Sequence, residues 1–134
     1  GLAVQRAASA AKSLGLMDIG QAVVASPDRV IAMEGIEGTR EMLVRVAGLA
    51  ERGRIGRAEP CVLFKGFKPQ QDPRFDLPSI GVETVDQVTA AGIVGIAMSA
   101  GHSLVIDPQA VVERASSASI FIHGVSVDDE ANNP

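Results

Sequence analysis

The segment between residues 65 and 81 holds the densest group of side chains that could bind or hydrolyse a phosphate ester. Its charged residues are three cations and two carboxylates, namely Lys65, Lys68, Arg74, Asp72 and Asp76. Arg and Lys neutralise phosphate oxygens, and Asp supplies the hard oxygen ligands that Mg²⁺ prefers. A carboxylate close to a metal can also position or deprotonate water. The segment therefore predicts phosphate-ester or phosphoanhydride chemistry, the alternative being a surface loop whose charges form ordinary salt bridges.

The backbone of this segment is predicted to be a rigid loop. It contains three of the seven prolines of the chain and shows neither a helical nor an alternating apolar pattern. Structureless loops of this length in small domains are usually functional or disordered, and the Phe, Leu and Ile side chains present here argue against disorder. We therefore expect a loop that leaves the end of a short apolar strand at 61–64.

A second candidate site is the run from Glu34 to Thr39, which reads Glu-Gly-Ile-Glu-Gly-Thr and precedes a predicted helix. Its glycines allow close approach of a ligand to the backbone, and the start of a helix presents free N–H groups to an anion. Glu34 or Glu37 could be a second metal ligand or base. The alternative is an ordinary strand-to-helix turn in which Thr39 caps the helix and nothing binds.

The remaining reactive side chains carry weaker signals. Cys61 begins an apolar strand and is expected to be a small buried residue, not a nucleophile. His102 and His123 lie too far apart in the sequence to match a metal-ligand spacing, and no Ser lies in a nucleophile-elbow pattern.

The composition limits the class of protein. With 134 residues, 46% of them hydrophobic and 21% charged, the chain suits one globular domain. A net charge of −4 and the absence of Trp and Tyr argue against a nucleic-acid partner. The single cysteine excludes an internal disulfide and a zinc site built from several cysteines.

Apolar periodicity and turn residues predict alternating helices and strands. Helices are expected at 3–14, 40–51, 84–91 and 108–118, and strands at 21–25, 29–34, 61–64, 93–98, 103–106 and 120–122. Thr84 and Asp107 are the expected N-terminal caps of the last two helices. The alternation predicts an α/β fold, and the early hairpin predicts a mixed β-sheet with flanking helices in a single domain. Residues 125–134 are expected to form a disordered acidic tail after a domain at 1–124.

One long motif resembles the signature of a known family. It reads Lys65-x-x-Lys68-Pro69-x-Gln71-Asp72-x-Arg74-x-Asp76-Leu77-Pro78-x-Ile80-Gly81-x-x-Thr84. This motif resembles that of the UDP-2,3-diacylglucosamine pyrophosphatases of bacterial lipid A biosynthesis, of the Mg²⁺-dependent type that is not calcineurin-like. The stretches 34–39 and 91–97 resemble two further blocks of the family, and the whole resemblance covers about residues 5–124.

The resemblance implies a reaction and a setting. Members of the family hydrolyse the pyrophosphate of UDP-2,3-diacylglucosamine to UMP and lipid X, by attack on the phosphorus of the nucleotide side, with Mg²⁺ as cofactor. They carry an N-terminal domain before the region that this sequence matches, and the lipid is held between the two domains. The chain would thus be the C-terminal domain of a two-domain enzyme, and without the other half of the cleft it could be inactive. The implied location is the cytoplasm, peripheral to the inner membrane of a Gram-negative bacterium.

The resemblance also implies roles for single residues. Asp72 would be essential for hydrolysis and Asp76 would be its acidic partner, both being candidate Mg²⁺ ligands. The residues that would bind substrate or phosphate are Lys65, Lys68, Gln71, Arg74, Glu37 and Thr39. Two readings compete with an enzyme: a non-catalytic domain that binds a phosphorylated or nucleotide-sugar ligand through the same loop, and a purely structural module.

Overall fold

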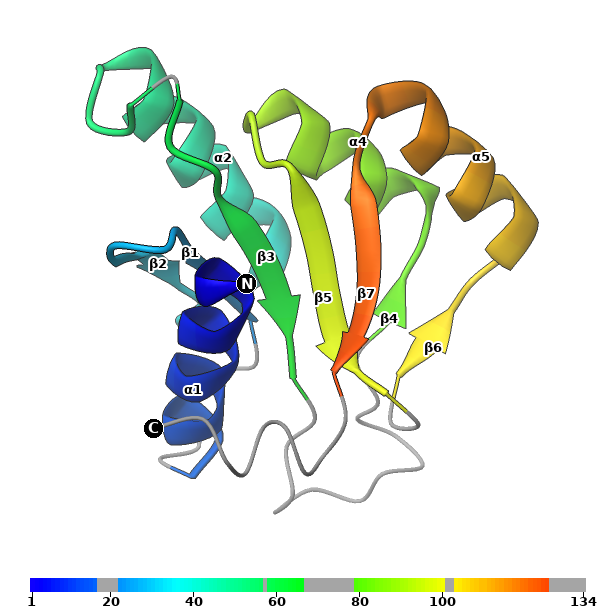
Figure 1. Ribbon diagram of the computed structural model, residues 1–134, viewed down its shortest axis with the longest axis horizontal. Helices are drawn as coiled ribbons and strands as arrows, with labels where there is room; N and C mark the ends of the chain where they lie inside the picture. The colour runs from blue at the N-terminus through cyan, green and yellow to red at the C-terminus, as the bar shows by residue number, and fades with distance from the viewer. Residues whose placement is uncertain (17–21, 57, 67–78, 101–102, 126–134) are drawn as a thin grey trace.

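The structure, a computed structural model, describes residues 1–16, 22–56, 58–66, 79–100 and 103–125 (Figure 1). In chain order its elements are α1 (Leu2–Leu16), β1 (Ala22–Ala25), β2 (Val30–Met33), α2 (Gly38–Glu51), β3 (Val62–Lys65), β4 (Ser79–Ile80), α4 (Val82–Ala90), β5 (Gly95–Ser99), β6 (Leu104–Val105), α5 (Pro108–Ala118) and β7 (Phe121–Val125). This alternation of helices and strands confirms the predicted α/β class.

The main sheet is mixed, as predicted. Its strand order is β2-β1-β3-β5-β7, with β1 antiparallel to both β2 and β3, and with β3, β5 and β7 parallel. The hairpin between β1 and β2 turns at Ser26, whose Oγ accepts the N–H groups of Asp28 at 3.2 Å and Arg29 at 3.3 Å. The short strands β4 and β6 pair with each other in parallel beside this sheet.

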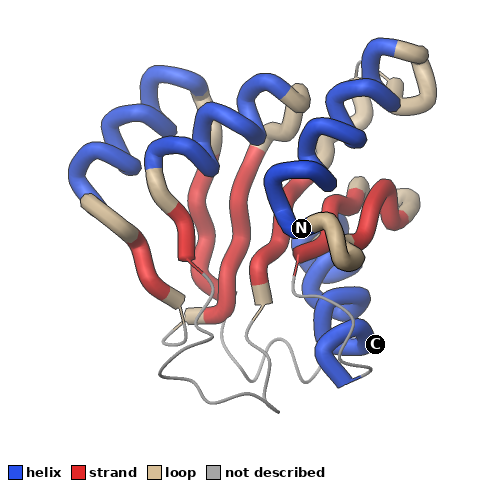
Figure 2. The backbone as a smooth tube through the Cα atoms, turned by 180° about the vertical axis from the view of Figure 1, so that it is seen from behind, coloured by secondary structure: helices blue, strands red, loops and turns tan. Residues whose placement is uncertain are grey.

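Helices cover both faces of the main sheet. Figure 1 shows α1 against β1 and β3 on one face, and Figure 2 shows α2, α4 and α5 together on the other. Alternate residues of β3 enter the two cores, since Leu63 packs on the side of the three helices and Phe64 on the side of α1. Phe64 is completely buried, which contributes roughly 1.5–3 kcal/mol to folding.

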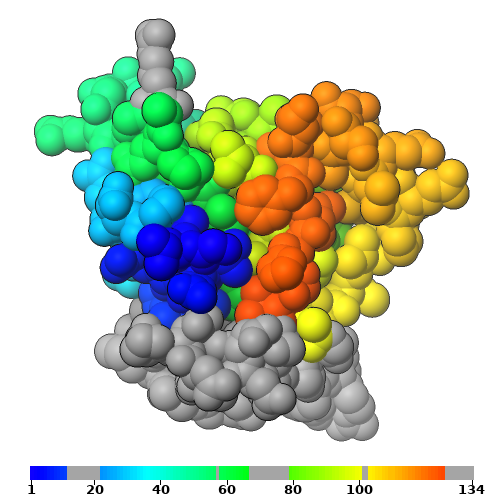
Figure 3. Space-filling model, viewed as in Figure 1, coloured from blue at the N-terminus to red at the C-terminus, as the bar shows by residue number. Residues whose placement is uncertain are grey.

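The first helix and the last strand meet on the α1 face. Val125 of β7 belongs to the same buried cluster as Ala7, Ala8 and Ala11 of α1. In the space-filling view the two segments form one continuous surface (Figure 3). On β7 the ring of Phe121 lies over Gly95 of β5, where it takes the space of a side chain. Val125 therefore belongs to the folded domain, one residue beyond the predicted boundary, and the rest of the expected tail lies outside the described residues.

Helix starts differ from the sequence predictions in instructive ways. Helix α4 begins at Val82, two residues before the predicted start, with Gly81 as its N-cap. Thr84 occupies the third helical position, from which its Oγ1 accepts the Gly81 N–H at 3.2 Å. Thr84 thus fills the reciprocal half of a capping arrangement and is not the N-cap itself.

The start of α5 also departs from the predicted cap. Asp107 is the N-cap residue and Pro108 follows it in the first turn, as expected. However, the Asp107 backbone is left-handed, with φ 54°, and its carboxylate makes no capping hydrogen bond among the described residues. Asp107 is therefore a turn residue of the kind that tolerates positive φ, and it is among the residues that line the cavity described below.

Among the helices that the structure describes, we find none that combines the length and the apolar character needed to cross a bilayer.

Candidate functional site

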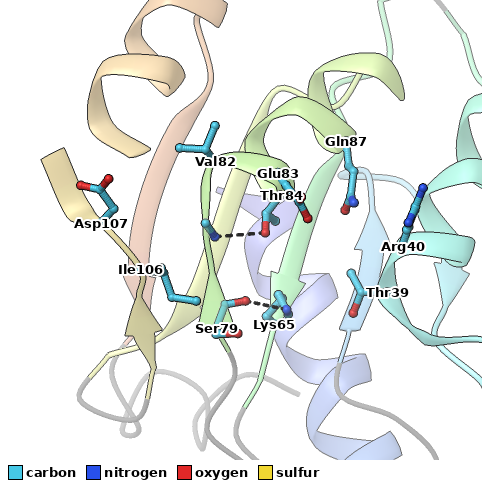
Figure 4. Close-up of a pocket in the computed structure, with 11 residues that line it drawn as sticks. Thr39, Arg40, Lys65, Ser79, Val82, Glu83, Thr84, Gln87, Ile106 and Asp107 are labelled. Atoms are coloured by element: carbon cyan, nitrogen blue, oxygen red, sulfur yellow. Dashed lines mark hydrogen bonds between the residues drawn. The ribbon is translucent and has the colours of Figure 1, made fainter. Parts of the chain in front are cut away.

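A cavity of about 500 Å³ lies where β3 ends and where α2, α4 and α5 begin (Figure 4). The described residues that line it are Thr39, Arg40, Lys65, Ser79, Gly81, Val82, Glu83, Thr84, Gln87, Ile106 and Asp107. In α/β sheets, ligands bind outside the carboxyl ends of parallel strands, where helix N-termini gather. The cavity has this position, which makes it the candidate site.

Lys65 is the central cation of the cavity. It is the last residue of β3, it is partly buried, and its Nζ donates a hydrogen bond to the Ser79 carbonyl oxygen at 2.7 Å. Burial lowers the pKa of the Lys65 ammonium, and the negative charge of Glu34 opposes this shift only in part. A partly desolvated ammonium of this kind gains stability from an anion that enters beside it.

The two walls beside Lys65 come from α4 and α2. Gly81, Val82, Glu83 and Thr84 bring the first turn of α4 to the cavity, and the N-terminal end of a helix dipole favours negative charge. Gln87 of α4 and Arg40 of α2 also line the cavity (Figure 4). Together with Lys65, these groups favour an anionic ligand with several oxygen acceptors, such as a phosphate.

Thr39 lies in the first turn of α2 and lines the same cavity. Its Oγ1 donates a hydrogen bond to Oε1 of Glu34 at 2.9 Å. The predicted N-cap role of Thr39 is wrong, because the helix begins at Gly38 and its N-cap is Glu37. The Gly35–Gly38 turn folds back far enough for Glu34 to reach the Thr39 hydroxyl, which then faces a carboxylate in place of a backbone N–H.

Glu37 has a different environment from Thr39. Its carboxylate pairs with Arg45 at 2.8 Å and accepts the Gly35 N–H at 3.3 Å. The hydrogen bond from Arg45 lowers the pKa of this carboxyl. Glu37 is not among the described residues that line the cavity. A role for Glu37 in substrate binding stays a prediction, and its visible contacts hold the turn before α2.

The structure thus brings two of the predicted site residues, Lys65 and Thr39, to one cavity. The other predicted residues of the long motif lie outside the described part of the chain: Lys68, Gln71, Asp72, Arg74 and Asp76. Lys65 and Ser79 flank this segment in the sequence, and the hydrogen bond from Lys65 to the Ser79 carbonyl oxygen joins them. Both of these described residues line the cavity.

Arg40 and Gln87 are lining residues that the sequence analysis missed. Arg40 directly follows the 34–39 block, so extending that block by one residue would have found it. Gln87 lies within the helix predicted at 84–91, and no pattern in the sequence marks it as a residue that lines a cavity.

The described residues offer no ready-made metal centre. Within 1–16, 22–56, 58–66, 79–100 and 103–125, no three His, Cys, Asp or Glu side chains gather in a way that could hold an ion. The two carboxylates predicted to bind Mg²⁺ lie outside these ranges, so Mg²⁺ stays a prediction.

The cysteine and the histidines stand apart from this cavity. Cys61 is buried just before β3, as predicted, and burial raises the pKa of its thiol, which makes it a poor nucleophile. His123 is exposed on β7, and His102 lies outside the described residues.

Comparisons with known proteins agree with the long motif. Residues 2–123 match the family described as the LpxI C-terminal domain. The chain is 44% identical over 124 residues to the UDP-2,3-diacylglucosamine pyrophosphatase LpxI of Caulobacter vibrioides. This alignment covers 91% of the chain and 44% of the relative, so the chain spans less than half of the relative's length.

Proposed function

The chain belongs to the family of LpxI C-terminal domains, and on this premise we propose that it takes part in hydrolysing the pyrophosphate bond of UDP-2,3-diacylglucosamine. The products would be UMP and 2,3-diacylglucosamine 1-phosphate (lipid X), and the pathway would be lipid A biosynthesis. The name of the Caulobacter relative supports this choice of substrate. The structural observation that carries the proposal is the partly buried Lys65 in a cavity at the carboxyl end of β3.

The cations of the cavity would bind the pyrophosphate. Lys65 and Arg40, with the first turn of α4, would hold its oxygens and stabilise the charge that develops on the leaving phosphate. Lys68 and Arg74 would add to this positive field, and Gln71 would contact the substrate. These groups act by electrostatic preorganisation, so no covalent intermediate is required.

The carboxylates of the motif would direct water to the phosphorus. In our proposal Asp72 orients the attacking water or accepts its proton. The oxygen of the water bonds to the phosphorus of the UMP side while the bond from that phosphorus to the bridging oxygen breaks, and lipid X leaves with that oxygen. Asp72 and Asp76 would be the ligands of Mg²⁺, which when bound would neutralise the non-bridging oxygens.

The setting of the reaction is also a proposal. The acylated substrate would lie between this domain and the N-terminal domain that members of the family carry. A nucleotide-sugar substrate and acyl chains fit a protein of the cytoplasm that contacts the inner membrane of a Gram-negative bacterium from its surface.

The test is hydrolysis of UDP-2,3-diacylglucosamine by the chain alone and by a chimera. In the chimera the chain is fused behind the region of the Caulobacter relative that precedes the matched segment. We expect UMP and lipid X from the chimera in Mg²⁺, and a loss of about 10²-fold or more in Asp72→Ala and in EDTA. Asp86→Ala is the matched control, because Asp86 pairs with Arg114 on the exposed side of α4 and should leave turnover unchanged.

The outcomes separate the two function classes. A folded chimera that binds the substrate and releases no UMP would overturn the enzyme reading in favour of a binding domain. A chimera that neither binds nor hydrolyses the substrate would leave only a structural module.

A further inference from the structure

The hydrogen bond between Thr39 and Glu34 has a defined direction. A hydroxyl carries one proton and two lone pairs, whereas a carboxylate oxygen can only accept. At a separation of 2.9 Å, Thr39 must therefore be the donor and Glu34 the acceptor. Glu34 is itself held in place by its backbone N–H, which donates to the Ala22 carbonyl oxygen at 2.9 Å. The proton of the Thr39 hydroxyl is thus already used in a hydrogen bond within the protein.

This direction restricts what Thr39 can offer to a ligand. Thr39 lines the cavity, and with its proton on Glu34 its oxygen can only accept a hydrogen bond from a bound molecule. The oxygens of a phosphate have no proton to give near neutral pH, so a phosphate does not suit this position. A sugar hydroxyl or an amide N–H does suit it.

We propose that Thr39 forms an acceptor subsite for the acylated sugar, with Glu34 as the positioning residue that fixes the direction of its hydroxyl. The inference rests on the proposed function and deepens it, because it assigns the two ends of the substrate to different parts of one cavity. Lys65 offers only donors and takes the phosphate, whereas Thr39 offers only an acceptor and takes an N–H or O–H of the 2,3-diacylglucosamine unit.

A purely structural role for the pair predicts something different. If the hydrogen bond served only to hold the turn before α2, its loss would change the stability of the fold and would lower the affinity for all ligands alike. An acceptor subsite predicts selective weakening of the sugar ligand. The two roles are therefore separated by comparing a ligand that has the acylated sugar with one that lacks it.

The experiment measures dissociation constants of lipid X and of UMP for the chimera described above, by calorimetry. We expect Thr39→Val to lower the affinity for lipid X by about tenfold and the affinity for UMP by less than about twofold, since only lipid X loses a hydrogen bond. Thr39→Ser keeps the hydroxyl and should restore the affinity for lipid X. Thr89→Val is the matched control, because its hydroxyl donates to the Val85 carbonyl oxygen within α4, away from the cavity lining.

The role of Glu34 is tested by a double-mutant cycle. Glu34→Leu frees the Thr39 proton, so the direction of the hydroxyl is no longer fixed. In this background we expect Thr39→Val to lower the affinity for lipid X by no more than about threefold, compared with about tenfold when Glu34 is present. Glu34→Gln keeps an acceptor oxygen and should behave like the wild type in the cycle. Thermal melting of each variant identifies any that fails to fold.

The results distinguish this inference from the proposed function. Three outcomes would overturn the inference alone. In Thr39→Val the affinities for UMP and lipid X could fall equally, or neither could fall. In the Glu34→Leu background, Thr39→Val could still lower the affinity for lipid X by the same factor as when Glu34 is present. A folded wild-type chimera that binds neither ligand would overturn the proposed function. An analogue of lipid X with an ester in place of its 2-amide identifies the donor. If Thr39→Val no longer lowers the affinity for this analogue, the donor is the amide N–H, and otherwise it is a hydroxyl.

Discussion

Arg29 and Lys65 are cations near opposite ends of β3, and their surroundings shift their pKa values in opposite directions. Arg29 donates to both carboxylate oxygens of Glu59, at 3.0 Å and 2.9 Å, and to the Arg54 carbonyl oxygen at 2.8 Å. The hydrogen bond with Glu59 raises the pKa of Arg29, and in return it lowers the pKa of Glu59 to about 2. For Lys65, burial dominates and the pKa is lowered.

The difference separates a structural ion pair from the cation that we propose binds the ligand. The guanidinium of Arg29 already has a carboxylate in bidentate geometry, so a ligand has little to add there. The ammonium of Lys65 is more buried, and its hydrogen bond goes to a neutral carbonyl oxygen. A partly buried cation such as Lys65 suits an anion-binding site, because the bound anion would offset the free-energy cost of burying the positive charge.

The largest effect that follows from this comparison is loss of turnover in Lys65→Met, a change that keeps the side-chain length and removes the charge. In the chimera we expect kcat/KM to fall by about 10²-fold or more, because the cation proposed to bind the pyrophosphate is lost. Since the folded protein no longer has to bury an ammonium, we expect its melting temperature to stay the same or to rise.

Arg29→Met is the matched control for that experiment. It should lower the melting temperature and leave kcat/KM within about twofold of the wild type, because Arg29 lies away from the cavity. Equal losses of turnover in both variants would break the comparison.

An intermediate effect concerns the pH dependence of ligand binding. Lys65 is charged below its lowered pKa, so the affinity for UMP should fall as the pH rises through that value, by up to about tenfold per pH unit. The fall should begin below pH 10.5, the ordinary value for Lys. In Lys65→Arg, which stays charged, UMP affinity between pH 7.5 and 10 should be nearly constant, as measured by calorimetry. The same pH profile in both proteins would show that another group titrates.

The smallest effect concerns stability at the opposite end of β3. The pKa of Glu59 is lowered in the folded state, so its ion pair stabilises the fold above about pH 4.5, and this stability is lost as the pH falls toward 2. Glu59→Gln should therefore lower the free energy of unfolding by about 1 kcal/mol at pH 7. The difference from the wild type should shrink at pH 3, as measured by urea denaturation. A constant difference at both pH values would assign the effect to packing and not to charge.

The fold was largely predictable because its main elements have strong local signals. The apolar run that begins at Cys61 predicts the central strand, and Ser26-Pro27-Asp28 predicts the hairpin turn, which Ser26 indeed holds. The two-residue strand β4 could not be predicted, since two residues show no periodicity. The start of α4 was misplaced because Thr is favourable at the N-cap, whereas here it lies three residues after the N-cap and its hydroxyl accepts the N–H of Gly81.

The candidate site was predictable where charge or the resemblance to the family marks it, as at Lys65 and Thr39. Lys65 stands out as a cation at the end of an apolar strand. Arg40 and Gln87 face the cavity because of how α2 and α4 pack against the sheet, and no local pattern encodes that orientation. The partnership of Thr39 with Glu34 depends on the path of the intervening turn, which the sequence alone does not define.

The ring of Phe121 over Gly95 has a consequence for how this domain can change in evolution. The ring takes the space of a side chain that Gly95 lacks, so the two positions form one packing unit shared by β5 and β7. A lineage that gains a side chain at position 95 must first acquire a smaller residue at 121, whereas the reverse order passes through a steric clash. The two positions are therefore expected to covary among relatives, with the permitted order of mutations set by geometry.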